Sequence, residues 1–440
     1  MSWFHARTAL LLAPLLACLF SLDSRADSPR FDSLAYQWAQ GRIIDTVQVH
    51  GNTRVKTFAI VREMESQPGS RLDALALDRD QRFLGDLSPF ATVNVHVEPI
   101  AEERAIIHVV VTERPTLLLK LIYPVLEYDF NTERIVYGLK WNDRNFRKRL
   151  QSFSAEGVRD NRDNNSASIG WSTGWVGWKH IGVGARASYF DRSSPTSEPA
   201  IFQQSRLAGS VSIPLTERRI AFSQIITGLS WAQNEIGMSA DDLDPEEIIS
   251  PSVGFRFDNR DASLKPRRGA YFFINVLTNV IVEGEGDAYY RIDNDIRWFH
   301  PVDETTVLGL RSALSVQLDD YPEYIRFGLG GPGTIRGYER SDFRSAHRWV
   351  QSAELRLMPW PKVLYKLPFI GLTDFQLGLV LFVDAGIGWT GKGSFTYDNV
   401  HTGFGAGLRL FSPIQDALRL DVGYSAAGRV RPYFSTGMNF

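Results

Sequence analysis

The chain has 440 residues, of which 44% are hydrophobic and 22% charged, and this composition excludes a disordered protein. Its formal net charge is -2 at pH 7, so no basic field indicates nucleic acid as a partner. Mean hydropathy is -0.17, and no apolar run after the first 26 residues is long enough for a spanning helix, which excludes a helical membrane protein. The only cysteine, Cys18, lies in a predicted leader, so disulfide frameworks, thiol catalysis and cysteine-ligated zinc are excluded from the mature chain.

Residues 1–26 are predicted to be an export signal. Basic residues precede an apolar run at 9–20, and residues 24–26 place small side chains at the cleavage positions. The run is too short for a spanning helix with flanking anchors. The residues before Cys18 also resemble a lipoprotein box, so lipidation of Cys18 stays open. We expect the mature chain to be exported and to begin with an N-terminal segment at 27–41.

Residues 42–115 are predicted to fold as a small α+β domain. Its expected elements are a strand at 43–49, a helix after Thr53, a second helix ending at Ser88-Pro89, and strands at 91–98 and 105–112. Thr53 can cap the first helix, and Pro68-Gly69 ends it. The turn after the first strand is expected at Gly51-Asn52.

The order β-α-α-β-β, with the Gly51-Asn52 turn and the passage at 87–90, resembles a POTRA (polypeptide-transport-associated) domain. This resemblance implies one small sheet covered by two helices, with an edge strand left unpaired. Such an edge can add a strand from an unfolded client through main-chain hydrogen bonds. We expect the client-binding edge at Val93, Val95 and Val97, and the alternative is a spacer domain that binds nothing.

Residues 116–440 alternate between apolar and polar side chains and show no convincing helical period. One example is the segment 418–425, in which Leu418, Leu420, Val422 and Tyr424 oppose Arg419, Asp421, Gly423 and Ser425. A soluble sandwich would alternate as well. The pairing of apolar faces with charged or glycine-rich faces instead favours a transmembrane barrel with a wet lumen.

Two further features favour the barrel. Nine of the 11 tryptophans lie in this region, many at segment ends where an aromatic girdle would sit. An exported chain without a helical span can cross a bilayer only as a closed barrel, which satisfies every backbone group. We count 16 candidate strands, an even number, as in bacterial single-chain barrels. The predicted fold class is therefore mainly β: a 16-stranded antiparallel transmembrane barrel at 116–440, preceded by one α+β POTRA domain.

Connection lengths indicate the orientation. With the N-terminal domain periplasmic, most outer connections are long and most periplasmic ones are short, as in outer-membrane barrels. The long outer connections are expected at 191–200, 236–249 and 318–348, and the short ones include 177–179 and 301–304, although 258–269 and 359–373 depart from the pattern. The acidic loop within 236–249 either binds calcium or is simply solvated.

The longest outer loop carries the most specific motif. Gly328, Gly330 and Gly333 satisfy a dinucleotide-binding spacing, but Pro332 and the flanking strands exclude that interpretation. The segment 335–338, Ile-Arg-Gly-Tyr, instead resembles the [V/I]RG[F/Y] motif of the superfamily of BamA, TamA and two-partner-secretion barrels. In that superfamily the loop folds back into the barrel, and its arginine pairs with acidic residues of the inner wall.

Two acids match that resemblance, and strand parity turns both inward independently. Glu354 matches the family's glutamate on the strand after the loop, and Asp384 matches the aspartate of its F-x-D-x-G box. We therefore expect Arg336, Gly337 and Tyr338 to form a loop lock with these acids, since an arginine fork that meets two carboxylates can fix one loop register. The alternative is that Arg336 is a solvated loop charge.

The end of the chain also resembles the family. Gly437 matches a glycine that weakens the closing strand, so a seam between the first strand (117–128) and the last is expected to open sideways. The alternative is that Gly437 makes room for a neighbouring side chain. Phe440 is expected on the lipid face, as the C-terminal signal that outer-membrane assembly machinery reads.

Together these features predict a Gram-negative outer-membrane protein that inserts proteins into the membrane or translocates polypeptides across it. Expected partners are the lipid bilayer, unfolded exported polypeptides and accessory proteins of the periplasm or inner membrane, with no nucleic acid, cofactor or metal. The sequence predicts one POTRA domain, whereas general assembly factors have several. This difference puts an essential assembly role in doubt. Alternatives are a two-partner-secretion transporter and a passive porin-like or structural barrel. An enzyme is not expected, because neither GxSxG nor HExxH occurs.

Overall fold

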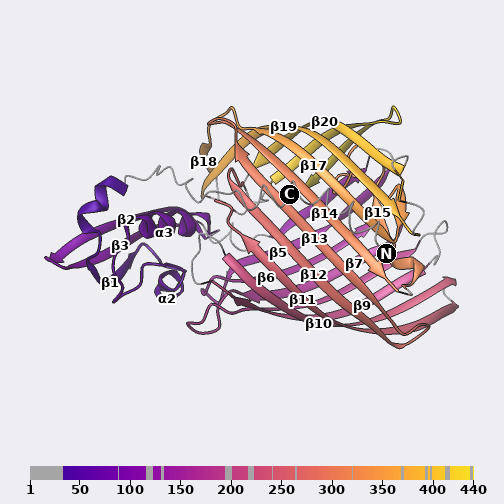
Figure 1. Cartoon of the computed structure of the whole chain (residues 1–440), viewed down its shortest axis with the longest axis horizontal. Helices are drawn as coiled ribbons and strands as arrows, with labels where there is room; N and C mark the ends of the chain where they lie inside the picture. The colour runs from indigo at the N-terminus through magenta and orange to yellow at the C-terminus, as the bar shows by residue number, and fades with distance from the viewer. Residues whose placement is uncertain are drawn as a thin grey trace, which may run out of the picture.

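The computed structural model describes most of the chain after its first 32 residues. It covers residues 33–440 except 88, 115–121, 130–132, 194–200, 217–221, 240, 263–264, 320, 368–370, 392–394, 397–398, 412–416 and 437–439. The predicted leader, with Cys18, and Gly437 therefore lie outside the described residues. Figure 1 shows a small α+β domain at one end of a large barrel of tilted strands.

The N-terminal domain has the predicted β-α-α-β-β order. Its elements are η1 (Ser33–Ala39), β1 (Ile43–His50), α2 (Thr57–Val61), α3 (Ala74–Asp86), β2 (Phe90–Ala101) and β3 (Arg104–Glu113). Strand β3 lies in the middle of the sheet, parallel to β1 and antiparallel to β2. Within the described residues, no helix combines the length and the apolar character needed to cross a membrane.

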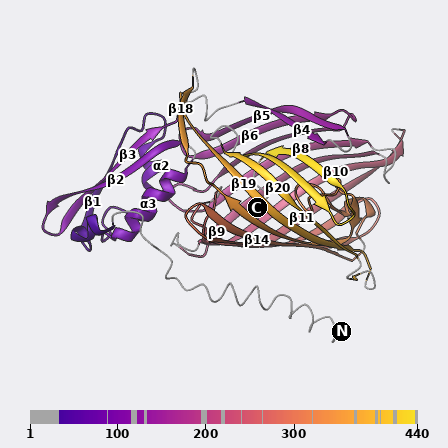
Figure 2. The ribbon, with the colours of Figure 1, turned by 90° about the horizontal axis from the view of Figure 1, so that it is seen from above.

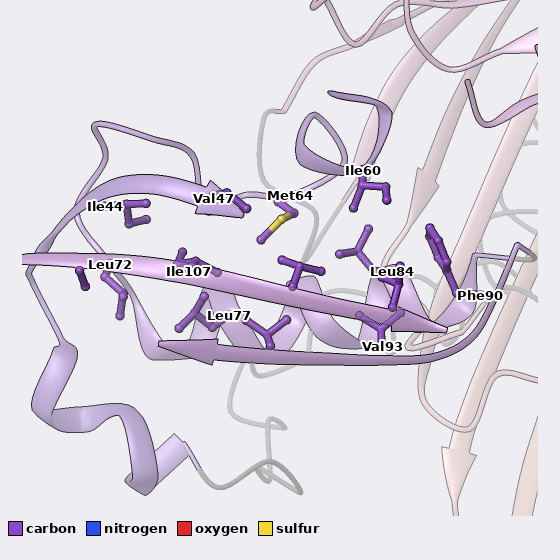
Figure 3. Close-up of a cluster of buried hydrophobic side chains, with 14 of the residues drawn as sticks. Ile44, Val47, Ile60, Met64, Leu72, Leu77, Leu84, Phe90, Val93 and Ile107 are labelled. Carbon is purple, nitrogen blue, oxygen red and sulfur yellow. The ribbon is translucent and has the colours of Figure 1, made fainter. Parts of the chain in front are cut away.

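One face of this sheet is covered by the helices. Alternate apolar side chains of the strands meet side chains of α2 and α3 in a closed core (Figure 3). Ile44, Ile60, Leu77, Leu84 and Ile107 are all at most 1% exposed. Because burial of such side chains stabilises each by roughly 1.5–3 kcal/mol, this core accounts for an independently packed domain.

The first helix begins later than its sequence indicates. Thr53 does not cap it; its hydroxyl donates to Glu113 on β3 (2.9 Å). The main-chain N–H groups of Arg54 and Val55 donate to the same carboxylate (2.7–3.0 Å). These bonds hold residues 53–55 in a loop against β3, so the helix forms only from Thr57, after Lys56.

The domain docks on turns at the near end of the barrel. Arg62, which is 5% exposed, donates to the carbonyl of Arg149 (2.7 Å), and its guanidinium lies 5.5 Å from the ring centre of Trp175. The main-chain N–H of Lys56 donates to the carbonyl of Lys148 (3.0 Å). Burial lowers the pKa of the Arg62 guanidinium. These contacts tie the domain to the β5–β6 and β7–β8 connections.

The barrel strands follow in chain order. They are β4 (Ile122–Asp129), β5 (Arg134–Phe146), β6 (Gln151–Asp160), β7 (Asn165–Thr173), β8 (Gly182–Ser193), β9 (Ile201–Pro214), β10 (Phe222–Ser239), β11 (Asp242–Asp258), β12 (Gly269–Glu283), β13 (Ala288–Pro301), β14 (Thr306–Leu318), β17 (His347–Leu357), β18 (Val363–Leu367), β19 (Gly371–Trp389), β20 (Val400–Phe411), β21 (Ala417–Ser425) and β22 (Val430–Thr436).

The strands close into one antiparallel sheet, in which β22 pairs with β4. Strands β17 and β18 pair with successive parts of β19, so they share one position along the wall. The described strands therefore occupy 16 positions around the closed barrel. Figure 2, turned from the first view, shows the same wall curving around an interior.

The two faces of the wall differ as strand parity predicts. Outward side chains such as Leu381, Val383 and Phe404 are 53–56% exposed, whereas the inward Glu354 and Asp384 are fully buried. The outer face of the barrel is therefore apolar and the inner face is charged, which is the arrangement that a lipid-embedded barrel requires.

One predicted outer loop is wrong. Strand β10 runs to Ser239 and β11 begins at Asp242, so 236–249 is a long hairpin and not a loop. Glu246 pairs in register with Asn234 and accepts a hydrogen bond from its side-chain amide (2.7 Å). The sequence pattern does not indicate strands here because the acidic side chains interrupt the apolar alternation. Among the described residues, no group of three or more His, Cys, Asp or Glu side chains is placed to hold a metal.

Candidate functional site: the lumenal loop and the closing strand

The connection between β14 and β17 turns back into the barrel. It contains the short helix η2 (Glu323–Ile325) and a hairpin of β15 (Phe327–Leu329) and β16 (Phe343–Ser345). Figure 1 places β15 toward the barrel end away from the N-terminal domain. We call residues 330–342, between the two hairpin strands, the loop tip. Ile335 of the tip is fully buried, with Leu329 and Val350 in the same apolar cluster.

Arg336 is the charged centre of the tip. Its Nε and Nη2 donate to the two oxygens of Asp384 (2.7 and 2.8 Å), and its Nη1 donates to Glu354 (2.8 Å). The main-chain N–H of Arg336 donates to Asp384 as well (3.0 Å). The guanidinium also lies 3.5 Å from the ring centre of Phe382. The structure thus brings together the arginine and both acids that the sequence singled out, and all three side chains are fully buried.

Further arginines extend this ion-pair network along the inner wall. Arg356 contacts Glu354 (2.9 Å), and Arg409 contacts Asp421 (2.7 Å). Arg419 contacts the other oxygen of Asp421 (2.9 Å). Strand parity places Arg409, Arg419 and Asp421 on the lumen face, but the sequence pattern does not indicate which cross-strand partner each side chain reaches. The sequence pattern therefore did not predict the network as a whole.

Glycines of the wall leave space for the backbone of the tip. A Cβ atom at Gly403 would overlap the carbonyl oxygen of Arg336, and one at Gly423 would lie 2.6 Å from the main-chain nitrogen of Gly337. A side chain at either position would therefore push the tip away from the wall. The docked loop thus explains the glycines at positions 403 and 423 of the inner wall.

Gly337 and Tyr338 contact the last strand of the barrel. The N–H of Gly337 donates to the hydroxyl of Tyr433 on β22 (2.9 Å), and this hydroxyl donates to the carbonyl of Tyr338 (2.6 Å). The ring of Tyr338 meets Phe343 and His401 edge-on, with centroids 5.5 and 5.6 Å apart. Sequence reasoning missed Tyr433; only its inward parity gave a signal.

Among the pairings that the structure describes in the closed wall, the shortest is the junction of β22 with β4, which we call the seam. Within the described residues it consists of two register pairs, Tyr433 with Asp129 and Phe434 with Tyr128. By contrast, β4 pairs with β5 at eight positions and β22 with β21 at seven. Gly437, which the sequence places at this seam, lies outside the described residues.

The predicted position of Phe440 is wrong. Phe440 is 3% exposed and belongs to a buried cluster with Phe299 of β13 and Val307 of β14. Its main-chain oxygen accepts a hydrogen bond from Arg356 of β17 (2.5 Å). These are inner-wall residues, so the ring faces the lumen and not lipid. The parity argument extended the alternation of the last strand to residue 440, but the contacts of Phe440 with β13 and β17 place its ring on the inner face.

The residues predicted to bind the client lie on an edge strand, but their side chains are part of the domain core. Strand β2 is at the edge of the three-stranded sheet, while Val93, Val95 and Val97 point into the core. At the outer edge, the N–H of Val95 donates to the side chain of Gln81 (2.9 Å). The carbonyl of Val95 accepts from the hydroxyl of Tyr36 (3.0 Å). Side chains of α3 and η1 thus occupy both main-chain groups of Val95.

Comparison with family models gives two matches. Residues 145–440 match the Omp85 superfamily domain, and residues 43–114 match the POTRA model, described as a surface antigen variable number repeat. A curated relative, the outer membrane protein assembly factor BamA of Nitratidesulfovibrio vulgaris (strain Hildenborough), is 25% identical over 404 residues. The match covers 87% of this chain and 48% of that protein, so the chain spans about half the length of this relative.

Solved structures share the fold. BamA of Haemophilus ducreyi lacking POTRA domains 1–3 has a TM-score of 0.55 at 15% identity, covering 90% of this chain and 84% of that chain. CdiB from Acinetobacter baumannii has a TM-score of 0.62 at 13% identity, covering 91% and 74%. CdiB from Escherichia coli has a TM-score of 0.63 at 14% identity, covering 90% and 76%.

The family model that matches residues 145–440 spans about two thirds of the sequence and includes the loop tip, both of its acids and the closing strand. A POTRA model matches the domain in front of the barrel. The chain therefore belongs to the Omp85 superfamily, as an outer-membrane β-barrel protein with a POTRA domain on the periplasmic side.

Proposed function

We propose that this protein inserts polypeptides into the bacterial outer membrane or passes them across it, with the POTRA domain receiving the client. The observation that carries the proposal is the seam, whose two described register pairs join β4 to β22. The relative named as an assembly factor and the neighbours named BamA and CdiB support a polypeptide-handling role. Insertion and translocation are two forms of this one proposal.

A short seam suits this role for a physical reason. Main-chain groups that lack a partner in hydrocarbon cost several kcal/mol each. Where the described edges of β4 and β22 do not pair with each other, they favour any strand that supplies main-chain hydrogen bonds. A client strand can add at such an edge with little sequence preference. No step of this mechanism needs covalent chemistry, and we propose no enzymatic activity.

The seated loop tip argues against a passive pore. Ile335 and Arg336 are fully buried inside the barrel. Contacts of Ile335, Arg336 and Gly337 reach β17, β19 and β22. A loop folded into the lumen in this way narrows it. We therefore expect low conductance at rest in a planar bilayer, and a steady open channel would favour the porin-like alternative.

The POTRA domain is proposed to receive the client at the edge of β2. Because Val95 is already bonded to Gln81 and Tyr36, a client strand has to displace these two side chains first. Replacing Tyr36 with Phe and Gln81 with Ala should increase cross-linking of clients to β2. Unchanged cross-linking would place the client site elsewhere. Accessory proteins of the periplasm or inner membrane are further proposed partners.

Reconstitution tests the proposed function. The full chain is placed in liposomes, and an unfolded outer-membrane barrel is added from urea. Folding of that substrate is followed by its resistance to protease and by its heat-dependent gel mobility. We expect faster folding than in empty liposomes of the same lipids. Equal rates with and without the protein would contradict the proposal.

A further inference from the structure

Within the described residues, β22 bonds the loop tip through inward side chains and pairs with β4 along its edge. Arg431 pairs with Glu339 of the tip (2.7 Å), and the hydroxyl of Tyr433 bonds the backbone at Gly337 and Tyr338. Arg431 and Tyr433 are 7% and 3% exposed. Two inward side chains of the closing strand therefore attach it to the tip, whereas two register pairs attach it to β4.

The hydroxyl of Tyr433 fits its position closely. It accepts from the N–H of Gly337 and donates to the carbonyl of Tyr338, so it uses both its acceptor and its donor capacity on successive residues. At 3% exposure, water has little access to replace either bond. Loss of the hydroxyl would leave two buried main-chain groups without partners, which is costly.

Tyr433 also belongs to the seam. Its main chain pairs with Asp129 of β4, one of the two described register pairs. The same residue thus joins the tip through its side chain and the seam through its main chain. We propose that Tyr433 is a positioning residue that couples them: the seated tip holds β22 in register with β4, and withdrawal of the tip frees the seam. This inference rests on the proposed function of the seam as the client site.

Coupling of this kind needs a tip that occupies a discrete position. Gly337 has a φ of 104°, and a Cβ there would lie 2.7 Å from the main-chain nitrogen of Ser425. The backbone therefore passes so close to β21 that a side chain at residue 337 would not fit. Arg336 holds the other side of the tip to Glu354 and Asp384, so withdrawal of the tip has to break the contacts on both sides.

The test is hydrogen–deuterium exchange of the full chain in lipid nanodiscs, with no client present. Tyr433→Phe keeps the ring and removes only the hydroxyl. We expect exchange in peptides covering β4 and β22 to become about 10- to 100-fold faster, as two buried hydrogen bonds imply. The matched control is Tyr424→Phe, because Tyr424 lies on β21 with its side chain on the outer face, 41% exposed. We expect the control and the β10–β13 peptides to be unchanged.

Coupling also requires that the two anchors depend on each other. Arg336→Ala alone should accelerate exchange at the seam, and adding Tyr433→Phe should then have little further effect. The inference is overturned if Tyr433→Phe accelerates exchange of residues 337–338 but leaves β4 and β22 unchanged. The inference is also overturned if the acceleration of exchange in the double variant equals the product of the accelerations in the two single variants. Since no client enters this experiment, a failed reconstitution would bear on the proposed function alone.

Discussion

Removal of the Arg336 side chain should release the loop tip while the barrel wall away from the seam stays paired. Arg336→Ala deletes three side-chain hydrogen bonds to two buried carboxylates. The two acids are affected differently. Glu354 keeps its ion pairs with Arg356 and Arg409 (2.9 and 3.8 Å), whereas each ion pair and hydrogen bond described for Asp384 involves Arg336. The variant therefore leaves the Asp384 carboxylate buried without a cation.

The size of the effect on the tip follows from the unpaired, buried charge of Asp384. Removing one partner of a buried ion pair costs about 3–5 kcal/mol. This cost applies to the seated tip and not to the withdrawn one, in which Asp384 is hydrated. At about 1.4 kcal/mol per factor of ten, the seated state should lose roughly 100- to 5,000-fold in relative population. The strand pairings of the barrel away from the seam do not depend on Arg336.

Hydrogen–deuterium exchange of residues 335–338 measures this population directly, because local opening free energies set exchange protection. We expect protection at these residues to fall by roughly 100- to 5,000-fold, as the energy estimated above implies. Arg311→Ala is the matched control, since this lumen arginine pairs with Asp295 (3.1 Å), which also retains Arg297. The control should leave protection at the tip unchanged.

A double-mutant cycle separates the ion pair from general disruption. Asp384→Asn removes the charge that Arg336→Ala would strand. The double variant should therefore be destabilised at the tip by about 0.5–3 kcal/mol less than the sum of the single variants. If Arg336→Ala retains wild-type protection at the tip, or if the two effects simply add, the ion pair does not hold the loop and the reasoning fails.

Three further predictions concern other parts of the chain. Gly423→Ala should unseat the tip without touching a charge, whereas Gly157→Ala, whose Cβ meets nothing within 4 Å, should not; exchange at the tip distinguishes them. Arg62→Ala should weaken docking of the POTRA domain by about 1–2 kcal/mol and expose the β5–β6 turn to protease. The control is Arg82→Ala on α3, where the arginine side chain is 48% exposed; equal digestion of the two variants would contradict the docking. Hydrogen bonds from Thr305 and Thr306 lower the pKa of Asp303 to about 2. Because this pKa is depressed on folding, the turn at 302–305 should keep its full stability above about pH 4 and lose it as the pH falls to about 2; amide protection that is constant over this range would refute it.

Much of the site could be predicted because strand parity is a strict rule. Leu379, Leu381 and Val383 occupy the outer face, which turns Asp384 inward without any structural knowledge. The same rule applied to Ala353 and Leu355 turns Glu354 inward. The motif at 335–338 then supplied the arginine by resemblance, and the structure places it between these two acids.

The rest could not be read from the pattern. Parity gives the face of Tyr433 but not the loop backbone that its hydroxyl reaches. The apolar spacing after Thr53 indicates a helix, yet the carboxylate of Glu113, 60 residues away, holds that segment as a loop. Phe440 shows the limit of extrapolation, because its contacts with β13 and β17 come from distant parts of the chain. Each miss depends on a contact between segments that the sequence does not place side by side.

The most direct measurement of the central claim is a reversible cross-link across the seam. Cysteines replacing Tyr128 and Phe434, which pair in register, are within disulfide reach. A control pair replaces Val276 and Ile292, which are register partners in the longer β12–β13 pairing. In reconstituted liposomes, oxidation of the seam pair should abolish the accelerated folding of the substrate, and reduction should restore it. The control pair should have no effect in either state. Full activity with the seam cross-linked would contradict the claim that this junction opens for the client.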